Sequence, residues 1–325
     1  MSAAQPRIVF LDAATYGDIS LQQFTDRWNC IVYPYTSPGE TIARMAGHTI
    51  AVTNKVAFDK TILNSAEAGH LKLIVVAATG TDIIDKEAAV SRGVKVCNAP
   101  GYATQSVAQF TMALVLELAT RAGKYGRAVQ LGEWQKSAIF SLVNFPHREL
   151  AGKKLGIIGY GNIGQAVSKM ARGFGLEILI AARPGSTAPF PKDRLPVNEL
   201  LQQADIVSLH CPLTPATKNL INRQTLSLMK PTAFLINTAR GALVDEAALL
   251  DALRHKRIAA AAIDVISQEP PPANHPMIQA TAELENLVVT PHTAWSAREA
   301  RQRLMIEVKS NIEAYLRNEP RNIVA

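Results

Sequence analysis

One short segment constrains this chain more than any other: an apolar strand that runs into three glycines and then into a helical pattern. Residues 155–164 read LGIIGYGNIG, with Gly159, Gly161 and Gly164 at GxGxxG spacing. In such a turn the first glycine permits a tight bend, the second lets the backbone approach a pyrophosphate, and the third lets the helix pack on the strand. The helix N-terminus then binds the diphosphate. The segment predicts a dinucleotide site; a plain strand–helix turn with incidental glycines is the alternative.

The residues that would read the ribose lie about 20 positions further on. An NAD site places a carboxylate there to bind the 2′-hydroxyl. Here Ala182 occupies that position and Arg183 follows it, with Ser186 nearby. Arg183 suits a 2′-phosphate, and Ser186 offers a hydroxyl donor. This favours NADP(H), with NAD(H) possible; the alternatives are that Arg183 stacks on the adenine or is simply solvated.

Short apolar runs alternate with helical patterns along the whole chain, which predicts parallel sheets covered by helices on both faces. The expected strands are 7–11, 50–53, 73–78, 94–98, 154–158, 177–181, 206–210, 233–237, 259–265 and 287–290. The main expected helices are 38–46, 84–92, 104–123 (with Ser106 as a possible N-cap) and 297–317. Because the glycine turn lies mid-chain, we expect an α/β protein of two Rossmann-like or flavodoxin-like domains. Residues 104–293 would form the dinucleotide-binding Rossmann domain. Residues 1–103 with 294–325 would form a discontinuous catalytic (substrate) domain, with the active site in the interdomain cleft.

Composition excludes several other classes. The 325 residues carry a net charge of +7 without a long basic run, which argues against nucleic-acid binding. The longest apolar stretch, 107–119, is too short for a bilayer, and we expect neither a signal peptide nor membrane association. Cys30, Cys97 and Cys211 are widely spaced, which predicts no metal site and a reduced, cytoplasmic protein.

Three polar residues follow successive strands of the second series. Arg240 follows the strand that ends at 237, Glu269 lies beyond 259–265, and His292 follows 287–290. Ligands bind outside the carboxyl ends of strands in such sheets. An arginine fork matches a substrate carboxylate, a histidine transfers the proton of a carbonyl, and a carboxylate holds the histidine charged and oriented. Singly, the alternatives are a helix-capping arginine, a loop glutamate and a core histidine; together they predict reduction of a 2-keto acid.

At this point the sequence resembles the D-isomer-specific 2-hydroxyacid dehydrogenase family. The matching runs are 155–164 (LGIIGYGNIG), 209–213 (LHCPL), 235–244 (LINTARGALV), 262–265 (AIDV), 269–270 (EP) and 289–295 (VTPHTAW). The resemblance extends over essentially the whole chain and implies that Arg240, Glu269 and His292 are catalytic. Gln109 stands where many members have a glutamate.

The resemblance also implies contacts at single positions. The implied cofactor contacts are Thr104, Asn162, Ile163, Cys211, Pro212, Thr238, Ala239 and Asp264. The implied substrate contacts are the loop of Ala78, Thr79 and Gly80, with Arg240, His292 and Trp295. Trp295 would narrow the pocket, unless it packs between domains. The family also implies a homodimer.

Within the family, residues 290–304 look most like glycerate dehydrogenases, also called hydroxypyruvate reductases. This implies reduction of hydroxypyruvate or glyoxylate to D-glycerate or glycolate. Three alternatives stay open. One is a dehydrogenase for another substrate, such as pyruvate or phosphoglycerate. The second is a corepressor-like protein that senses dinucleotide on the same fold. The third, disfavoured by the absence of a long basic run, is a nucleic-acid-binding role for the net positive charge.

Overall fold

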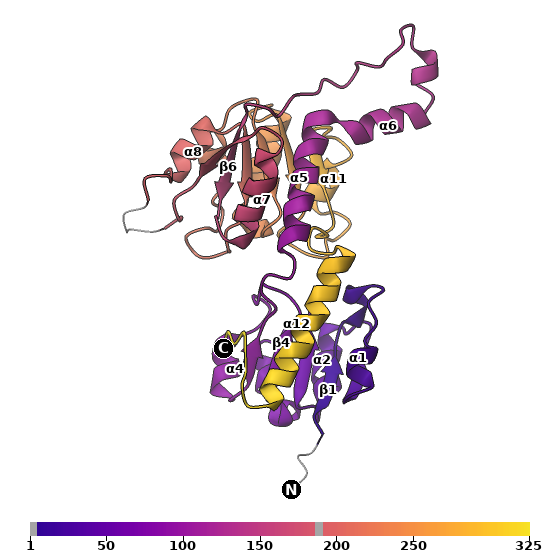
Figure 1. Cartoon of the computed structure of the whole chain (residues 1–325), viewed down its shortest axis with the longest axis vertical. Helices are drawn as coiled ribbons and strands as arrows, with labels where there is room; N and C mark the ends of the chain where they lie inside the picture. The colour runs from indigo at the N-terminus through magenta and orange to yellow at the C-terminus, as the bar shows by residue number, and fades with distance from the viewer. Residues whose placement is uncertain (1–4, 186–190) are drawn as a thin grey trace. The chain divides into compact units, whose positions relative to one another are not determined.

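The computed structural model describes residues 5–185 and 191–325, which divide into two compact units. The first unit comprises residues 1–103 and 296–325, and the second comprises 104–295. Both are parallel α/β units, so the predicted fold class is confirmed. Figure 1 shows the elements of each. No helix in the described ranges has the length and hydropathy needed to cross a membrane.

The first unit is built on a five-stranded sheet of order β2-β1-β3-β4-β5. Its strands are β1 Arg7–Phe10, β2 Asn29–Val32, β3 Ile50–Thr53, β4 Leu73–Val76 and β5 Lys95–Cys97. Its helices are α1 Gln22–Thr25, α2 Thr41–Met45, α3 Lys60–Leu63, α4 Lys86–Ser91 and α12 Arg298–Leu316. Every residue of β3 and β4 is buried, because helices cover both faces of a parallel sheet. Helix α12 returns to this sheet, where Asn311 donates to the Asn98 carbonyl at 2.8 Å.

The second unit has a six-stranded sheet of order β11-β10-β9-β8-β6-β7. Its strands are β6 Lys154–Ile158, β7 Glu177–Ile180, β8 Ile206–Leu209, β9 Phe234–Asn237, β10 Ala260–Ile263 and β11 Leu287–Val289. Its helices are α5 Thr104–Thr120, α6 Ala122–Gln130, α7 Asn162–Arg172, α8 Val197–Gln203, α9 Arg223–Leu226, α10 Glu246–Arg254 and α11 Pro276–Ala280. β7, the next strand along the chain, pairs with β6 on one side, and β8 then pairs with β6 on its other side. This reversal opens a crevice at the carboxyl end of β6, where the glycine turn lies.

Every strand expected from the sequence is found, and the described part of the chain contains one further strand. The additional strand, β2, lies at the edge of its sheet with Ile31 and Val32 exposed. Its short apolar run, residues 30–33 (CIVY), stays largely exposed, because an edge strand need not bury both faces.

The long helix predicted over 104–123 is two helices. α5 ends at Thr120, Arg121 adopts a left-handed conformation with φ of 58°, and α6 begins at Ala122. Ser106 is not the N-cap, because it lies within the first turn of α5. Its hydroxyl is buried and donates to the Ala294 carbonyl at 2.6 Å.

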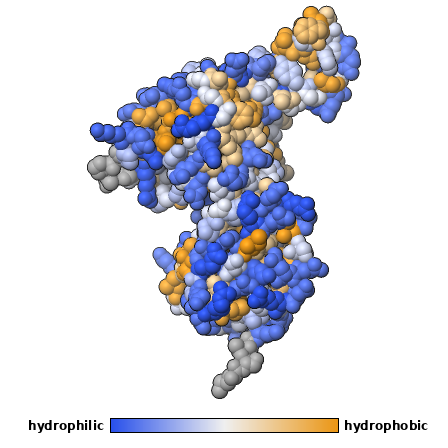
Figure 2. All heavy atoms as spheres, in the orientation of Figure 1, coloured by the Kyte–Doolittle hydropathy of each residue, from blue (hydrophilic) through white to orange (hydrophobic). Residues whose placement is uncertain are grey.

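An arm formed by α6 and the irregular segment after it projects from the second unit (Figure 1). We define the arm as residues 122–147. In Figure 2, orange spheres, which mark hydrophobic residues, cover much of the outer part of the arm. Its exposed apolar side chains are Val129, Leu131, Trp134, Ile139, Phe140 and Val143, of which Phe140 is 91% exposed. Contiguous exposed apolar patches are uncommon on monomeric soluble proteins.

Candidate active site

The glycine turn has the geometry of a phosphate cradle. Gly159 has φ of 98°, and a Cβ there would lie 2.4 Å from the Cys211 nitrogen. A Cβ at Gly164 would lie 2.2 Å from the Gly159 carbonyl oxygen. By contrast, no described residue comes within 4 Å of a Cβ placed at Gly161. The first and third glycines are therefore required by packing, and the second faces open space.

The same turn leaves the N-terminus of α7 uncapped. Asn162 and Ile163 open the helix, and no side chain caps it at Gly161. An uncapped helix N-terminus beside open space suits a diphosphate, because its N–H groups and dipole attract an anion. The residues present therefore fit the dinucleotide that the turn predicts.

The two loops that would border the adenosine pack against each other. A Cβ at Gly185 would lie 2.5 Å from the Cβ of Ala216, so the loop after β7 contacts the loop after β8. Arg183 is exposed in the first of these loops, with Ala182 partly buried before it. Ser186 lies outside the described residues.

Burial keeps the groups at the end of β8 neutral. Burial lowers the pKa of the His210 imidazole to about 4, and its Nε2 lies 2.8 Å from Ser208 Oγ. Burial raises the pKa of the Cys211 thiol to about 11. Cys211 therefore carries no nucleophilic thiolate at neutral pH, and its backbone packs against Gly159. Pro212 follows it, and its carbonyl accepts a bond from the Thr217 hydroxyl.

The structure brings Glu269 and His292 together. Glu269 Oε2 lies 2.5 Å from His292 Nδ1, and the other carboxylate oxygen accepts the Ile266 N–H at 2.9 Å. Both side chains are partly exposed, at 30% for Glu269 and 25% for His292. The pair thus stays open to a ligand, with the second ring nitrogen, Nε2, opposite the one that contacts the glutamate.

Arg240 lies at the carboxyl end of β9, the strand beside β10. Its carbonyl accepts a bond from the Asn237 amide at 2.9 Å, and its guanidinium donates to the Ala239 carbonyl at 2.7 Å. The next residue, Gly241, lies against the Glu269 loop, since a Cβ there would lie 2.1 Å from the Ile266 carbonyl carbon. Backbone packing therefore fixes Arg240 relative to that loop.

Asp264 organises the loop that carries His292. Its buried carboxylate accepts the Thr290 hydroxyl at 2.5 Å and the N–H groups of Thr293 and Ala294 at 3.0 and 2.9 Å. The His292 N–H donates to the Asp264 carbonyl at 2.8 Å. These bonds hold His292 at φ of 50°, a left-handed conformation that is uncommon outside glycine. The family resemblance implies that Asp264 contacts the cofactor, and these bonds show that its carboxylate also stabilises the loop that carries His292.

Helix α5 supports the site in a way that the sequence did not predict. The Thr111 hydroxyl lies 3.0 Å from the Thr238 hydroxyl, and Ser106 bonds to Ala294. Ala239, beside Thr238, donates its N–H to the Asn237 side chain. The partners of Ser106 and Thr111 are 188 and 127 residues away in sequence, so no local pattern could reveal them.

The remaining residues that the resemblance assigned to cofactor or substrate lie outside the strand ends described above. Thr104 is the first residue of α5, and Trp295 is a partly exposed residue directly after Ala294. Ala78, Thr79 and Gly80 belong to the first unit, in the loop that follows β4. The Thr79 hydroxyl donates to the Ala99 carbonyl at 3.1 Å, which ties this loop to the segment after β5.

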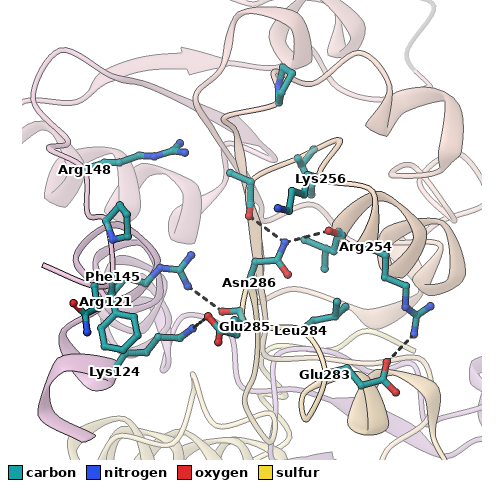
Figure 3. Close-up of a pocket in the computed structure, with 16 residues that line it drawn as sticks. Arg121, Lys124, Phe145, Arg148, Arg254, Lys256, Glu283, Leu284, Glu285 and Asn286 are labelled. Carbon is teal, nitrogen blue, oxygen red and sulfur yellow. Dashed lines mark hydrogen bonds and ion pairs between the residues drawn. The ribbon is translucent and has the colours of Figure 1, made fainter. Parts of the chain in front are cut away.

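A cavity of about 540 Å³ lies away from these residues, beside the amino ends of β9, β10 and β11 (Figure 3). It is lined by five basic side chains, Arg121, Lys124, Arg148, Arg254 and Lys256, with Glu283 and Glu285. Much of this charge is satisfied within the cavity. Lys124 pairs with Glu285 at 3.0 Å, Arg254 with Glu283 at 3.4 Å, and Arg121 and Arg148 donate to backbone carbonyls. The described residues that line the cavity include none of the predicted site residues.

Comparison with known proteins decides the family. Residues 112–294 match the model of the D-isomer specific 2-hydroxyacid dehydrogenase, NAD binding domain. The chain belongs to the D-isomer-specific 2-hydroxyacid dehydrogenase family. It is therefore a dehydrogenase of 2-hydroxy acids that uses a nicotinamide dinucleotide.

Relatives in the family match over nearly the full chain. A glycerate dehydrogenase of Methylorubrum extorquens is 41% identical, with 98% of each chain covered. A hydroxypyruvate reductase of Blautia hydrogenotrophica is 35% identical, covering 98% of this chain and 99% of its own. Among solved structures, a protein of Thermus thermophilus is 35% identical with a TM-score of 0.84, covering 98% of this chain and all of its own.

Proposed function

We propose that this dehydrogenase reduces hydroxypyruvate or glyoxylate, giving D-glycerate or glycolate. The contact that carries the proposal is the 2.5 Å pairing of His292 Nδ1 with Glu269 Oε2. These two residues follow β11 and β10, which lie in sequence across the sheet from β9, the strand that Arg240 follows. This arrangement supplies a proton donor, a group that orients it and a cation for the substrate. The names of the relatives, glycerate dehydrogenase and hydroxypyruvate reductase, support the choice of substrate.

Each of the three residues has a distinct role in this proposal. The planar guanidinium of Arg240 binds the substrate carboxylate through two parallel bonds and polarises the C2 carbonyl. His292 directs Nε2 at the carbonyl oxygen and donates the proton, because Nδ1 is held by Glu269. The negative charge of Glu269 stabilises the imidazolium form and fixes the ring orientation. When bound, the reduced nicotinamide supplies the hydride to C2, and in oxidation His292 accepts the proton instead.

Small substrates are favoured by two further proposed contacts. The backbone N–H groups of the loop of Ala78, Thr79 and Gly80 would bind the substrate carboxylate. Trp295, three residues after His292, would limit the size of the group at C3.

A matrix of initial rates tests this proposal, with hydroxypyruvate, glyoxylate, pyruvate and phenylpyruvate each combined with NADH and NADPH. Hydroxypyruvate and glyoxylate are expected to give the highest kcat/KM. Preference for phenylpyruvate would overturn the substrate assignment, and no turnover with any pair would favour the dinucleotide-sensing alternative.

We also propose that NADPH is preferred over NADH. Ala182 replaces the carboxylate that would bind a 2′-hydroxyl, and the exposed guanidinium of Arg183 follows it. A structural neighbour at 28% identity and TM-score 0.83 is an acyclic imino acid reductase in complex with NADPH. That neighbour supports the idea that this fold accepts the phosphorylated cofactor, and the choice in this chain rests on Arg183.

Replacing Arg183 by alanine is expected to raise the Kd of NADPH about thirtyfold, because a charge-assisted contact is worth roughly 2 kcal/mol. The Kd of NADH should change less than about threefold, since NADH carries no 2′-phosphate. Fluorescence titration of both dinucleotides measures the two values. Lys169→Ala, which removes an exposed positive charge from α7, is the matched control. An equal rise in the Kd of NADPH and of NADH in Arg183→Ala would contradict a role for Arg183 in binding the 2′-phosphate.

We propose further that the protein is a cytoplasmic homodimer. The exposed apolar side chains of the arm support self-association, because apolar groups of this kind are usually covered in an assembly. The three free thiols, Cys30, Cys97 and Cys211, fit a reducing compartment. Light scattering coupled to gel filtration reads the mass directly, and a monomer at micromolar concentration would contradict the dimer.

A further inference from the structure

The carboxylate of Glu246 hydrogen-bonds one end of the loop that carries Glu269 and lies close to the other end. Glu246 is the first residue of α10, and its side chain is 17% exposed. Its Oε1 accepts the Ser267 N–H at 2.6 Å, and its Oε2 accepts the Ser267 hydroxyl at 3.0 Å. The same Oε2 lies 3.6 Å from Nε2 of His275, at the far end of the loop. One side chain therefore joins positions 267 and 275 on either side of Glu269.

The hydrogen bond made by Nδ1 of His275 fixes which ring nitrogen carries the hydrogen. Nδ1 accepts the Met277 N–H at 3.3 Å and so caps α11. A nitrogen that accepts a bond carries no hydrogen, so the hydrogen of the neutral ring lies on Nε2, which faces Glu246. At 3.6 Å the contact is electrostatic rather than a direct hydrogen bond. His275 is only 6% exposed, which limits screening of this contact by water.

The segment that Glu246 fixes lies between Arg240 and Glu269. A Cβ at Gly241 would lie 2.6 Å from the Ser267 nitrogen, so this backbone rests directly on the turn after Arg240. The neighbouring Ile266 N–H donates to Glu269 Oε1, and Glu269 Oε2 contacts His292. A continuous series of contacts thus leads from Glu246 through Ser267 and Ile266 to the Glu269–His292 pair.

Helix capping does not account for the carboxylate of Glu246. Asp245 is the N-cap of α10, and its side chain accepts the Ala248 N–H at 3.0 Å. The first turn of α10 therefore has its capping group without Glu246. What the Glu246 carboxylate contributes specifically is its set of bonds to the Glu269 loop.

We propose that Glu246 is a positioning residue for keto-acid reduction, assisted by His275. By fixing Ser267 and the end of the loop, it holds the Ile266 N–H where it orients the Glu269 carboxylate toward His292. The inference rests on the proposed roles of Glu269 and His292 and adds a residue that touches neither substrate nor cofactor.

The test replaces Glu246 by glutamine and compares it with Glu199→Gln. Glu199 is an exposed glutamate in the first turn of α8, so its replacement removes a comparable helix-terminal charge without touching the loop. We expect Glu246→Gln to lower kcat for hydroxypyruvate ten- to a hundredfold, roughly what misplacement of a reacting group costs. The alkaline limb of its pH–rate profile should move to lower pH, because the imidazolium loses a well-placed carboxylate. The Kd of NADPH should stay within about twofold of the parent value, and Glu199→Gln should leave kcat and the profile unchanged.

A double variant separates positioning from a general loss of stability. If Glu246 acts through Glu269, adding Glu246→Gln to Glu269→Gln should change kcat less than about twofold. The proposal would be overturned if the losses of kcat from the two substitutions multiplied in the double variant. It would also be overturned if Glu246→Gln kept the parent pH–rate profile and only lowered Tm. Should Glu246→Gln fail to fold, Ser267→Ala removes only the 3.0 Å hydroxyl bond and is expected to shift the profile the same way, by less.

A second readout does not depend on turnover. NMR of ring-labelled histidine follows the Nδ1 resonance of His292 in the free protein, and Glu246→Gln should shift this resonance because the contact with Glu269 is altered. An unchanged resonance refutes the positioning role. Absence of keto-acid turnover in the parent protein instead refutes the proposed function, so the two failures are distinguishable.

Discussion

Replacing His292 by alanine is expected to lower kcat for hydroxypyruvate reduction about a thousandfold, within the range typical for loss of a general acid. The dinucleotide Kd should stay within about twofold, because the glycine turn and α7 that would hold the diphosphate lie on other elements. Steady-state kinetics and fluorescence titration of NADPH measure the two quantities.

The matched control is His255→Ala, an exposed histidine at the end of α10 in the same unit. It removes an imidazole that also lies close to a carboxylate, that of Asp251, and should leave kcat unchanged. Loss of dinucleotide binding in His292→Ala, with kcat preserved at saturation, would contradict the assigned proton transfer.

Replacing Arg240 by alanine is expected to lower kcat/KM by about two hundredfold. Loss of the guanidinium removes the cation that pairs with the substrate carboxylate and polarises the carbonyl, which costs roughly 3 kcal/mol in a desolvated site. Arg240→Lys should recover only part of this loss, because an ammonium keeps the charge without the planar fork. Initial rates over a range of hydroxypyruvate concentrations measure both variants.

Arg172→Ala, in the last turn of α7, serves as the control for loss of a positive charge. It should leave kcat/KM for hydroxypyruvate unchanged. If Arg240→Lys proved as active as the parent, two-point binding of the carboxylate would be wrong, and a charge alone would suffice.

The sequence predicted what depends on local pattern. The strand at 154–158, the glycines and the helix after them form one contiguous run, in which Gly159 and Gly164 are required by packing and Gly161 leaves open space where a diphosphate could approach. Glu269 and His292 were predicted as partners because each follows a strand of one parallel sheet, and their 2.5 Å contact follows from that topology. Their chemical roles rest on the family resemblance as well as on this placement.

What the sequence did not predict depends on tertiary contacts. The break at Arg121 is one left-handed residue within a continuous helical pattern, and the short apolar run of β2 lies exposed at the edge of its sheet. Ser106 has the sequence position of a cap, yet its hydroxyl bonds to Ala294, far along the chain. Glu246 belongs to an ordinary helical start, and only the folded loop shows that it binds Ser267.

The most direct measurement of the central claim is a single turnover with protein in excess over reduced dinucleotide. Hydroxypyruvate is mixed with the preformed complex, and absorbance and chiral analysis follow cofactor and product. We predict that the parent protein oxidises one equivalent of NADPH to NADP+ while it reduces one equivalent of hydroxypyruvate to D-glycerate, and that His292→Ala binds NADPH but reacts about a thousandfold more slowly. Equal rates for the parent and His292→Ala, or no consumption of NADPH or NADH by the parent, would contradict a keto-acid reductase centred on Arg240, Glu269 and His292.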